Sequence, residues 1–317
     1  MSLSTTKSWS TMHPLNPEDR GAIDAMRKLL ESHKGELKGT AARPRFDEIM
    51  GYTPPADGVT YESDRIGRVP GVWCRPRDVR SVDEAILYLH GGWHVFGSAL
   101  AYRHFVGHVA ARAGAAAFVA GYRLAPEHPF PAAVEDVRAC YRGLIGRGWR
   151  RIAIVGDSAG GGLSLVLLSI ATAEKGVGGV VPVCAVVLSP VTDMTFAGGS
   201  WETRAAVDLY FTRAQAAALL HAYLGDHDPA DPLASPVYGD LTGLPPIRVH
   251  VGEHEVLLDD SRRYVARAVA AGVDAKVDVW QGMQHVFAAS VGKLSAAARS
   301  LDSIGAFLRE RLAMPPS

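Results

Sequence analysis

Ser158 lies between two glycines in the run Gly156-Asp157-Ser158-Ala159-Gly160, and an apolar stretch, residues 151–155, comes directly before it. A strand that leads through a glycine-flanked serine into a helix is the context in which the serine occupies a strained, exposed turn. The glycines matter because such a turn bends too sharply for a side chain at those positions. The pattern predicts that Ser158 is a nucleophile for acyl transfer. The pentapeptide alone is also compatible with an ordinary glycine-rich turn.

A serine hydroxyl attacks a carbonyl only with a base, an acid that orients the base, and donors for the oxyanion. In this kind of turn the partners follow in the order serine, acid, histidine. We predict that His285 is the base, because it lies in a loop after the strand-like run 275–280. His250 falls inside the strand-like run 247–251, and His254 is expected in a loop with an exposed side chain. The remaining candidates, which fall in an insertion between core elements, are His221 and His227.

The acid is expected after the strand-like run 247–251. Either Asp or Glu can hold the imidazole in the required tautomer and stabilise the imidazolium that forms in the transition state. Four carboxylates within eight residues make the local pattern uninformative, and the residues alone leave the choice open: Glu253, Glu255, Asp259 and Asp260.

A glycine pair also follows an earlier apolar run, residues 85–89, in the sequence His90-Gly91-Gly92-Trp93. Glycines after a strand let backbone N–H groups turn toward a developing oxyanion. We therefore expect an oxyanion hole made by the backbone amides of Gly92, Trp93 and Ala159. Considered alone, the glycine pair could be only a loop. The ordered set of glycine loop, serine turn, acid and histidine is far more specific than any one member.

These residues resemble the hormone-sensitive lipase-like branch of the α/β-hydrolases, the bacterial carboxylesterases, over about residues 85–312. The marks of the resemblance are the glycine loop, the serine turn, the long run 122–133 (YRLAPEHPFPAA), Ser189-Pro190, residues 234–236, residues 244–246 and residues 282–287. The resemblance implies an α/β fold: an α/β-hydrolase with a mostly parallel central sheet flanked by helices, and with a helical cap. It implies that the run 122–133 forms an ordered loop that braces the nucleophile region.

The resemblance places the acid at Glu255, with Asp259 as the second choice. It implies a serine carboxylic-ester hydrolase that acts on small, short-chain acyl esters through an acyl-enzyme. A lactone hydrolase or a deacetylase with the same triad is the nearest alternative. An alternative of another class is a hydrolase-fold ligand-binding receptor, as in plant relatives that lack a triad member. One departure from the family is Trp93, which stands where the family usually has a third glycine, so that its indole could narrow the acyl side of the pocket.

Composition limits the other classes of function. Lys plus Arg equal Asp plus Glu at 33 each in 317 residues, so charge gives no reason to expect nucleic acid or an anionic membrane as partner. No motif calls for a cofactor or a metal. Residues 1–7 contain no apolar segment typical of a signal peptide, so we expect a cytoplasmic protein. The family resemblance is compatible with a homodimer. The three cysteines lie far apart in apolar stretches and are expected to be buried thiols: Cys74, Cys140 and Cys184.

Strand-like and helical runs alternate along the chain, which predicts a mostly parallel sheet covered on both faces. The expected strands are 59–63, 72–75, 85–89, 116–121, 152–155, 184–188, 247–251 and 275–280. The expected helices are 16–34, 45–50, 102–113, 132–146, 160–175 and 261–271. We divide the chain into N-terminal cap helices (1–55), the first part of the core (56–194), a cap insertion (195–232) and the second part of the core (233–317).

Within the insertion, Thr212 and Gln215 match a capping box that starts a helix. Aromatic and apolar residues before it could line the substrate channel or form the core of the cap, and the core interpretation is favoured: Trp201, Leu209, Tyr210 and Phe211. The candidates for contact with substrate are Trp93, His94, Tyr210 and Phe211.

Two further patterns have simpler interpretations. His104 and His108 are four residues apart on an expected helix, but no third metal ligand accompanies them, so we predict packed or surface histidines. Asp157 is too close to Ser158 to orient a base on another loop, and we predict that it braces the turn.

Overall fold

The computed structural model describes residues 8–174 and 180–314. In this part of the chain nine strands form one sheet in the order β1-β9-β8-β7-β6-β4-β5-β3-β2. Only the pairings of β3 with β2 and with β5 are antiparallel. The strands are β1 Ser10–His13, β2 Val59–Ile66, β3 Val69–Pro76, β4 Glu84–Leu89, β5 Ala116–Ala120, β6 Arg151–Asp157, β7 Cys184–Leu188, β8 Ile247–Gly252 and β9 Ala275–Trp280. The predicted parallel sheet is confirmed.

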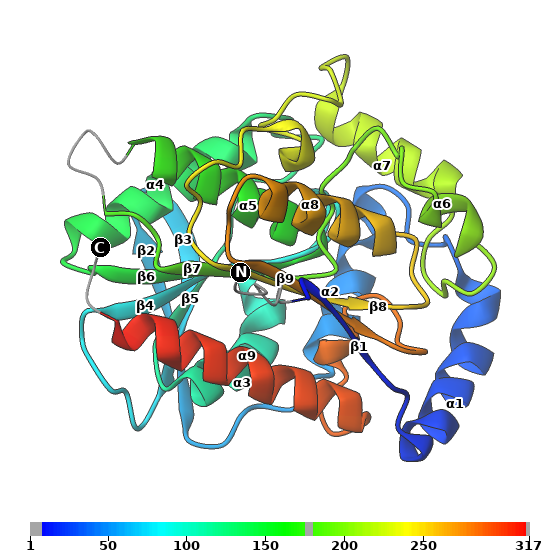
Figure 1. Cartoon of the computed structure of the whole chain (residues 1–317), viewed down its shortest axis with the longest axis horizontal. Helices are drawn as coiled ribbons and strands as arrows, with labels where there is room; N and C mark the ends of the chain where they lie inside the picture. Colours follow the sequence, from blue (N-terminus) through cyan, green and yellow to red (C-terminus); the bar gives the residue numbers. More distant parts are fainter. Residues whose placement is uncertain (1–7, 175–179, 315–317) are drawn as a thin grey trace, which may run out of the picture.

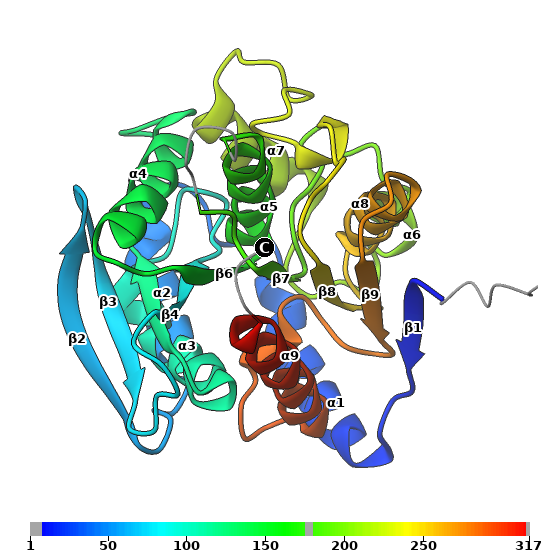
Figure 2. The ribbon, with the colours of Figure 1, turned by 60° about the vertical axis from the view of Figure 1, so that its left-hand side comes forward.

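Helices cover both faces of this sheet (Figure 1). On one face lie α4 (Ala132–Gly146), α5 (Ser158–Ala173) and α8 (Leu258–Ala270), and on the other α3 (Ala99–Ala113) and α9 (Ser295–Ala313). The remaining helices are α1 (Arg20–Leu30), α2 (Arg43–Gly51), α6 (Ser200–Thr203) and α7 (Arg213–Leu224). Figure 2 shows α9 on the side of the sheet opposite to α5 and α8.

Two apolar cores follow from the alternation of side chains along each strand. In β6, Ile152 and Ile154 join the core under α4, α5 and α8. Ala153 and Val155 of the same strand join the core under α3 and α9. All four side chains are fully buried. Because each central strand is apolar on both faces, these strands appear in the sequence as continuous apolar runs.

The predicted elements are present with modest changes of their ends. The helix expected at 102–113 begins earlier, at Ala99, because Ser98 caps it by accepting the N–H of Ala101. The helix expected at 261–271 begins at Leu258. The capping residue Thr212 accepts the N–H of Gln215, as predicted, but the Gln215 side chain donates to Leu37 O instead of returning to Thr212.

Three elements were absent from the prediction: β1, α9 and the one-turn helix α6. The strand β1 pairs in parallel with β9, from the opposite end of the chain. The helix α9 buries Leu301, Ile304 and Leu308. Two expectations concern residues outside the described ranges: the absence of a signal segment at residues 1–7 and the end of the fifth helix at Lys175.

Since the central strands run parallel, their carboxyl ends meet at one edge of the sheet. That edge holds the end of β4 before the glycine loop, the end of β6 before Ser158, and the ends of β8 and β9. The fold therefore brings the four predicted site segments to one edge.

Candidate active site

Ser158 is the first residue of α5 and follows β6 without a linker. Its φ of 54° lies in the left-handed region, which is unfavourable for a residue with a side chain. The flanking glycines are required by contact: a Cβ on Gly156 would lie 2.5 Å from Gly160 O, and one on Gly160 would lie 2.1 Å from Leu89 O. The turn therefore has the close packing and the strain expected of a nucleophile turn.

Glu255 and His285 form a direct pair at the same edge of the sheet. Nδ1 of His285 donates to Oε2 of Glu255 at 2.7 Å, and the Glu255 side chain has no exposed surface. The other carboxylate oxygen accepts from Ser189 Oγ at 2.8 Å and from the backbone N–H of Gly252 at 2.6 Å. Glu255 is thus a fully buried carboxylate whose two oxygens accept hydrogen bonds from three donors.

Ser189, one of the marks of the family resemblance, links Glu255 to the loop that carries His285. Its hydroxyl donates to Glu255 and accepts the N–H of Val286, the residue after His285, at 3.1 Å. Ser189 is fully buried and has a φ of 46°. This single side chain therefore supports both loops that carry the pair.

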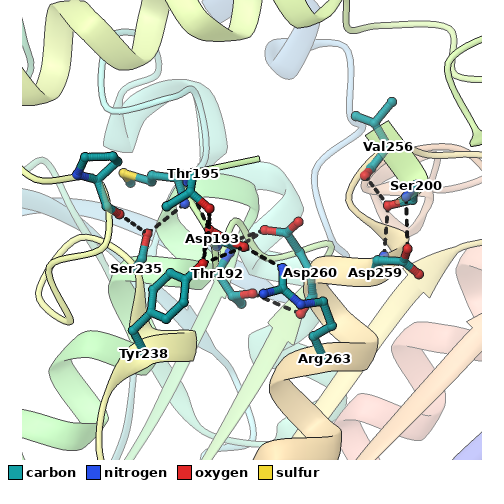
Figure 3. A network of polar contacts seen from close by, with 12 residues as sticks. Thr192, Asp193, Thr195, Ser200, Ser235, Tyr238, Val256, Asp259, Asp260 and Arg263 are labelled. Carbon is teal, nitrogen blue, oxygen red and sulfur yellow. Dashed lines mark hydrogen bonds and ion pairs between the residues drawn. The ribbon is translucent and has the colours of Figure 1, made fainter. Parts of the chain in front are cut away.

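Asp259, the second choice for the acid, has a different partner. Its carboxylate accepts the backbone N–H of Ser200, and its own N–H donates to Ser200 Oγ. Figure 3 shows Asp259 turned toward Ser200 at the start of α6. Asp259 thus anchors the start of α6, and among the described residues no hydrogen bond or ion pair joins it to His285.

Asp260, another of the four carboxylates, belongs to a separate network (Figure 3). It accepts the backbone N–H groups of Thr192 and Asp193, and Asp193 in turn pairs with Arg263 at 2.5 Å. Burial raises the pKa of Asp260 to about 8. This network fixes the segment that follows β7 against α8, close to the turn that carries Glu255.

Asp157 braces the serine turn, as predicted. It accepts from Tyr88 Oη at 2.8 Å, from Tyr102 Oη at 3.1 Å and from the N–H of Gly91 at 3.0 Å. Burial raises its pKa to about 6, against the opposing effects of the tyrosine hydroxyls and of the charge of His285. Among the described residues, no hydrogen bond joins Ser158 Oγ to His285.

The glycine loop contains three residues in succession with positive φ: Gly92 (115°), Trp93 (54°) and His94 (59°). A Cβ on Gly92 would lie 2.4 Å from Phe96 O, so this position requires glycine. Within the described ranges, no protein acceptor is bonded to the N–H of Gly92, Trp93 or Ala159. Three backbone donors that lack a protein partner are available for an oxyanion.

The run 122–133 contacts the glycine loop at two points, in keeping with the predicted bracing role. Tyr122 Oη donates to His90 O at 2.6 Å, and the Tyr122 ring stacks on the His90 ring at a centroid distance of 4.4 Å. Ala125 N donates to His94 O at 2.8 Å. Arg43 reaches the same region from the N-terminal segment and donates to Val95 O.

Four aromatic side chains pack together next to His285, and we call this cluster the aromatic wall: Trp93, Phe196, Trp201 and Phe211. The Trp93 ring contacts the other three at centroid distances of 5.5–6.4 Å. Phe211 also meets the His285 ring edge-on at 4.9 Å. Trp93 and Trp201 are buried, and Phe211 is half-buried. Phe211 thus lies in contact with both the Trp93 indole and the His285 ring.

The other substrate candidates occupy different positions. Tyr210 is half-buried, with its ring centroid 6.5 Å from that of His285. His94 is buried and stacks on Tyr223 at 3.9 Å, and burial lowers its pKa to about 3. Trp201 and Leu209 are core residues of this region, as favoured.

The remaining histidines have structural surroundings. His250 is a buried residue of β8, as predicted. The expectation of an exposed His254 was wrong, because it is half-buried and its Nδ1 is enclosed. His104 and His108 bond the carbonyls of Thr53 and Pro54, so both are packing histidines.

The three cysteines are buried free thiols, as predicted. Within residues 8–174 and 180–314, no helix combines the length and the hydropathy needed to cross a bilayer. No group of three metal-ligating side chains is found in the same ranges.

Comparison with known proteins decides the family. Residues 86–289 match the family model described as the alpha/beta hydrolase fold. The chain belongs to the α/β-hydrolase family. A solved esterase of the bacterial hormone-sensitive lipase family is 39% identical to this hydrolase, with a TM-score of 0.85 over 94% of this chain and 99% of the other. The solved structure of EstE5 is 36% identical, with a TM-score of 0.87 over 95% and 100%.

Two further relatives are also named as hydrolases of this kind. An acetyl-hydrolase from Streptomyces hygroscopicus is 38% identical over 296 residues, which cover 90% of this hydrolase and 96% of the relative. An esterase from Acinetobacter venetianus is 32% identical over 254 residues, which cover 79% and 82%. The expected resemblance to the bacterial hormone-sensitive lipase-like branch is confirmed, as is the expected class of enzyme, a carboxylesterase-type hydrolase.

Proposed function

We propose that this hydrolase is a serine carboxylesterase that uses Ser158 as nucleophile, His285 as base and Glu255 as acid. The observation that carries the proposal is the 2.7 Å bond between His285 and a fully buried Glu255, at the sheet edge that also holds the strained Ser158 turn. A carboxylate on Nδ1 keeps Nε2 free to accept a proton. Two of the three groups are therefore already paired for general-base catalysis.

In the proposed reaction, Ser158 Oγ bonds to the ester carbonyl carbon while its proton passes to Nε2 of His285. The carbonyl oxygen becomes an oxyanion and accepts from the amides of Gly92, Trp93 and Ala159. The C–O bond to the alcohol then breaks, the alcohol leaves with the proton from His285, and an acyl-enzyme remains. Water then attacks the acyl carbon while His285 takes its proton. The bond from the acyl carbon to Ser158 Oγ breaks, Ser158 Oγ receives the proton from His285, and the carboxylic acid is released. Loss of one oxyanion donor in such a site costs about 2.7–4 kcal/mol of barrier.

We propose that the acyl group is short. The aromatic wall supports this, because the buried Trp93 indole takes up volume beside the glycine loop, where a glycine would leave space. The relative from Streptomyces is named an acetyl-hydrolase, so acetyl esters are the first substrates to test. Because that name does not specify the group that carries the acetyl, deacetylation of another acceptor is the second candidate reaction.

We also propose that the N-terminal segment and the insertion at 195–232 act together as the cap. Lys34 Nζ donates to Ala205 O at 2.6 Å and to Asp208 O at 2.7 Å. Gly35 N donates to Tyr210 O at 3.1 Å, and Gln215 Nε2 to Leu37 O at 2.8 Å. These contacts support a cap made of two segments that are distant in sequence.

The decisive test compares Ser158→Ala with the natural chain on p-nitrophenyl acetate, with folding checked by circular dichroism. We expect Ser158→Ala to lose turnover and also labelling by a fluorophosphonate probe, which reacts with an activated serine. Full residual turnover would reject Ser158 as nucleophile. If the natural chain neither turned over a panel of esters and lactones nor took the label, the ligand-receptor alternative would replace the esterase.

A further inference from the structure

Asp208 is a buried carboxylate in the insertion at 195–232, and its partners among the described residues are backbone N–H groups near the proposed triad. It is 1% exposed. Its Oδ2 accepts the N–H of Val256, the residue after Glu255, at 2.9 Å. Its Oδ1 accepts the N–H groups of Tyr210 and Phe211 at 2.8 and 2.9 Å. One carboxylate therefore joins the turn that carries the acid to the two aromatic residues that face the base.

Gln284 makes a second connection to the same part of the insertion. It immediately precedes His285 and is 3% exposed. Its side-chain oxygen accepts the N–H of Leu209 at 3.2 Å, and its amide nitrogen donates to Val207 O at 3.3 Å. Residues 207–211, which we call the strap, are therefore bonded next to the acid and next to the base.

The strap also places two aromatic rings next to the imidazole of His285. Phe211 and Tyr210 are at its end, and their rings lie 4.9 and 6.5 Å from the ring of His285. The Lys34 ammonium group and the N–H of Gly35 hold the strap from outside through the carbonyls of Asp208 and Tyr210. The strap is thus enclosed between the N-terminal segment and the two loops of the triad.

We propose that Asp208 and Gln284 are positioning residues, which act through the strap to align Glu255 and His285; this proposal rests on the proposed function. Neither residue touches the reacting atoms. Asp208 sets the turn that presents Glu255, because Val256 N–H has no freedom to turn away while it is bonded. Gln284 sets the backbone from which His285 projects. The positions of the cap and of the triad are then coupled. Displacement of the cap moves Glu255 and His285 out of the alignment that catalysis requires.

Removal of either connection acts on the transition state more than on the bound substrate. The imidazolium that Glu255 stabilises forms only during the reaction, so poorer alignment lowers kcat. Misplacement of catalytic groups by a distant change can cost up to about 100-fold in rate. A weaker bond from His285 to Glu255 also makes the imidazolium easier to deprotonate. The acidic limb of the pH–rate profile then moves to lower pH.

The experiment uses Asp208→Asn and Gln284→Met in the full chain, with kcat and KM for p-nitrophenyl acetate. Rates are expressed per active site, counted by fluorophosphonate labelling carried to completion. We expect kcat to fall by about 10- to 100-fold while KM changes by less than about threefold. We also expect the acidic limb to move down in both variants. Asp208→Asn also removes a negative charge close to the triad, so the shift of the acidic limb in Gln284→Met, which leaves Glu255, Asp157 and Asp208 unchanged, is the one that reports alignment.

Matched controls come from groups that make similar bonds elsewhere. Gln281 lies in the same loop as Gln284, but its side chain accepts the N–H of Leu15 at 3.3 Å, away from the strap. Asp240 accepts the N–H of Thr242 at 2.9 Å in an exposed loop. Gln281→Met and Asp240→Asn should keep the natural kcat, KM and pH profile.

The outcomes separate this proposal from the proposed function. If kcat per labelled site and the acidic limb are unchanged in Gln284→Met and Asp208→Asn, the positioning role is refuted while the esterase stands. If Asp208→Asn fails to fold, Gln284→Met decides alone. If a lower rate is explained entirely by fewer labelled sites, both residues serve only stability. Failure of the esterase itself would appear in Ser158→Ala instead.

Discussion

His285 Nδ1 lies 2.7 Å from Oε2 of Glu255, and the carboxylate that receives this bond is completely shielded from water. Its second oxygen is bonded by Ser189 and by the Gly252 N–H. A carboxylate held by three donors cannot rotate away from the imidazole without leaving buried donors unpaired. Each such unpaired group costs about 1–3 kcal/mol. The pair is therefore preorganised before any substrate binds.

The identity of the acid can be tested by two amide substitutions. Glu255→Gln replaces the carboxylate by a neutral amide, so the imidazole loses its anionic partner. The NH₂ group of the amide must also face a donor, which is either His285 or the pair Ser189 and Gly252. We expect kcat to fall by about 10⁴-fold, the loss found when the carboxylate of such a triad becomes an amide. Steady-state kinetics on p-nitrophenyl acetate measure this.

The matched change is Asp259→Asn, which keeps an oxygen for the N–H of Ser200. We expect its kcat to stay within about twofold of the natural value and its stability to fall by about 1 kcal/mol. A large loss of kcat in Asp259→Asn together with normal activity in Glu255→Gln would reverse the assignment.

The size of the acyl pocket can be tested at Trp93. Trp93→Gly removes an indole buried against Phe196, Trp201 and Phe211, and a φ of 54° suits glycine. We expect kcat/KM for hexanoyl and octanoyl esters, relative to acetyl, to rise by about tenfold, which corresponds to about 1.4 kcal/mol of binding. A hydrolysis series across acyl chain length provides the measurement.

A control for Trp93 is Trp149→Ala, which removes an indole stacked on Trp73 outside the site, at a centroid distance of 5.3 Å. It should lower the melting temperature and leave the chain-length preference unchanged. If Trp93→Gly also leaves that preference unchanged, Trp93 does not limit the acyl pocket.

The dependence of stability on pH can be tested at Asp260. Burial raises its pKa to about 8 in the folded chain, against an ordinary value of 3.8. Between these two values the folded state holds a proton that the unfolded state has released. The free energy of unfolding therefore falls as pH rises through this window, by at most about 1.4 kcal/mol per pH unit for this one group.

Asp260→Asn removes this titration and keeps an oxygen for the N–H groups of Thr192 and Asp193. We expect urea denaturation to give a fall in stability from pH 6 to pH 8 for the natural chain and a flatter line for Asp260→Asn. Asp157, with a pKa of about 6, is half ionised at the start of this window and titrates equally in both proteins, so the difference between their slopes reports Asp260. The exposed Asp240→Asn variant should keep the natural slope; equal slopes in all three proteins would show that Asp260 is charged in the folded state.

Features that depend on neighbouring residues were predictable from the sequence. The serine turn is one, because the sharp turn requires glycine at positions 156 and 160 and the sequence has glycine at both. The central strands are another, since burial on both faces produces continuous apolar runs. The helix α9 was missed although Leu301, Ile304 and Leu308 carry a helical period. The strand β1 has only four residues, and its partner is β9, more than 260 residues away, so no local pattern could predict it.

The choice of acid depended on tertiary structure. Glu253, Glu255, Asp259 and Asp260 share one short segment and one chemistry, so the residues alone gave no preference among them. In the folded chain, Glu255 meets His285, Asp259 meets Ser200, and Asp260 meets the backbone after β7. Ser189 and Asp208 are ordinary polar residues in sequence. They gain their roles from contacts with segments 48 to 97 residues away, which only packing can create.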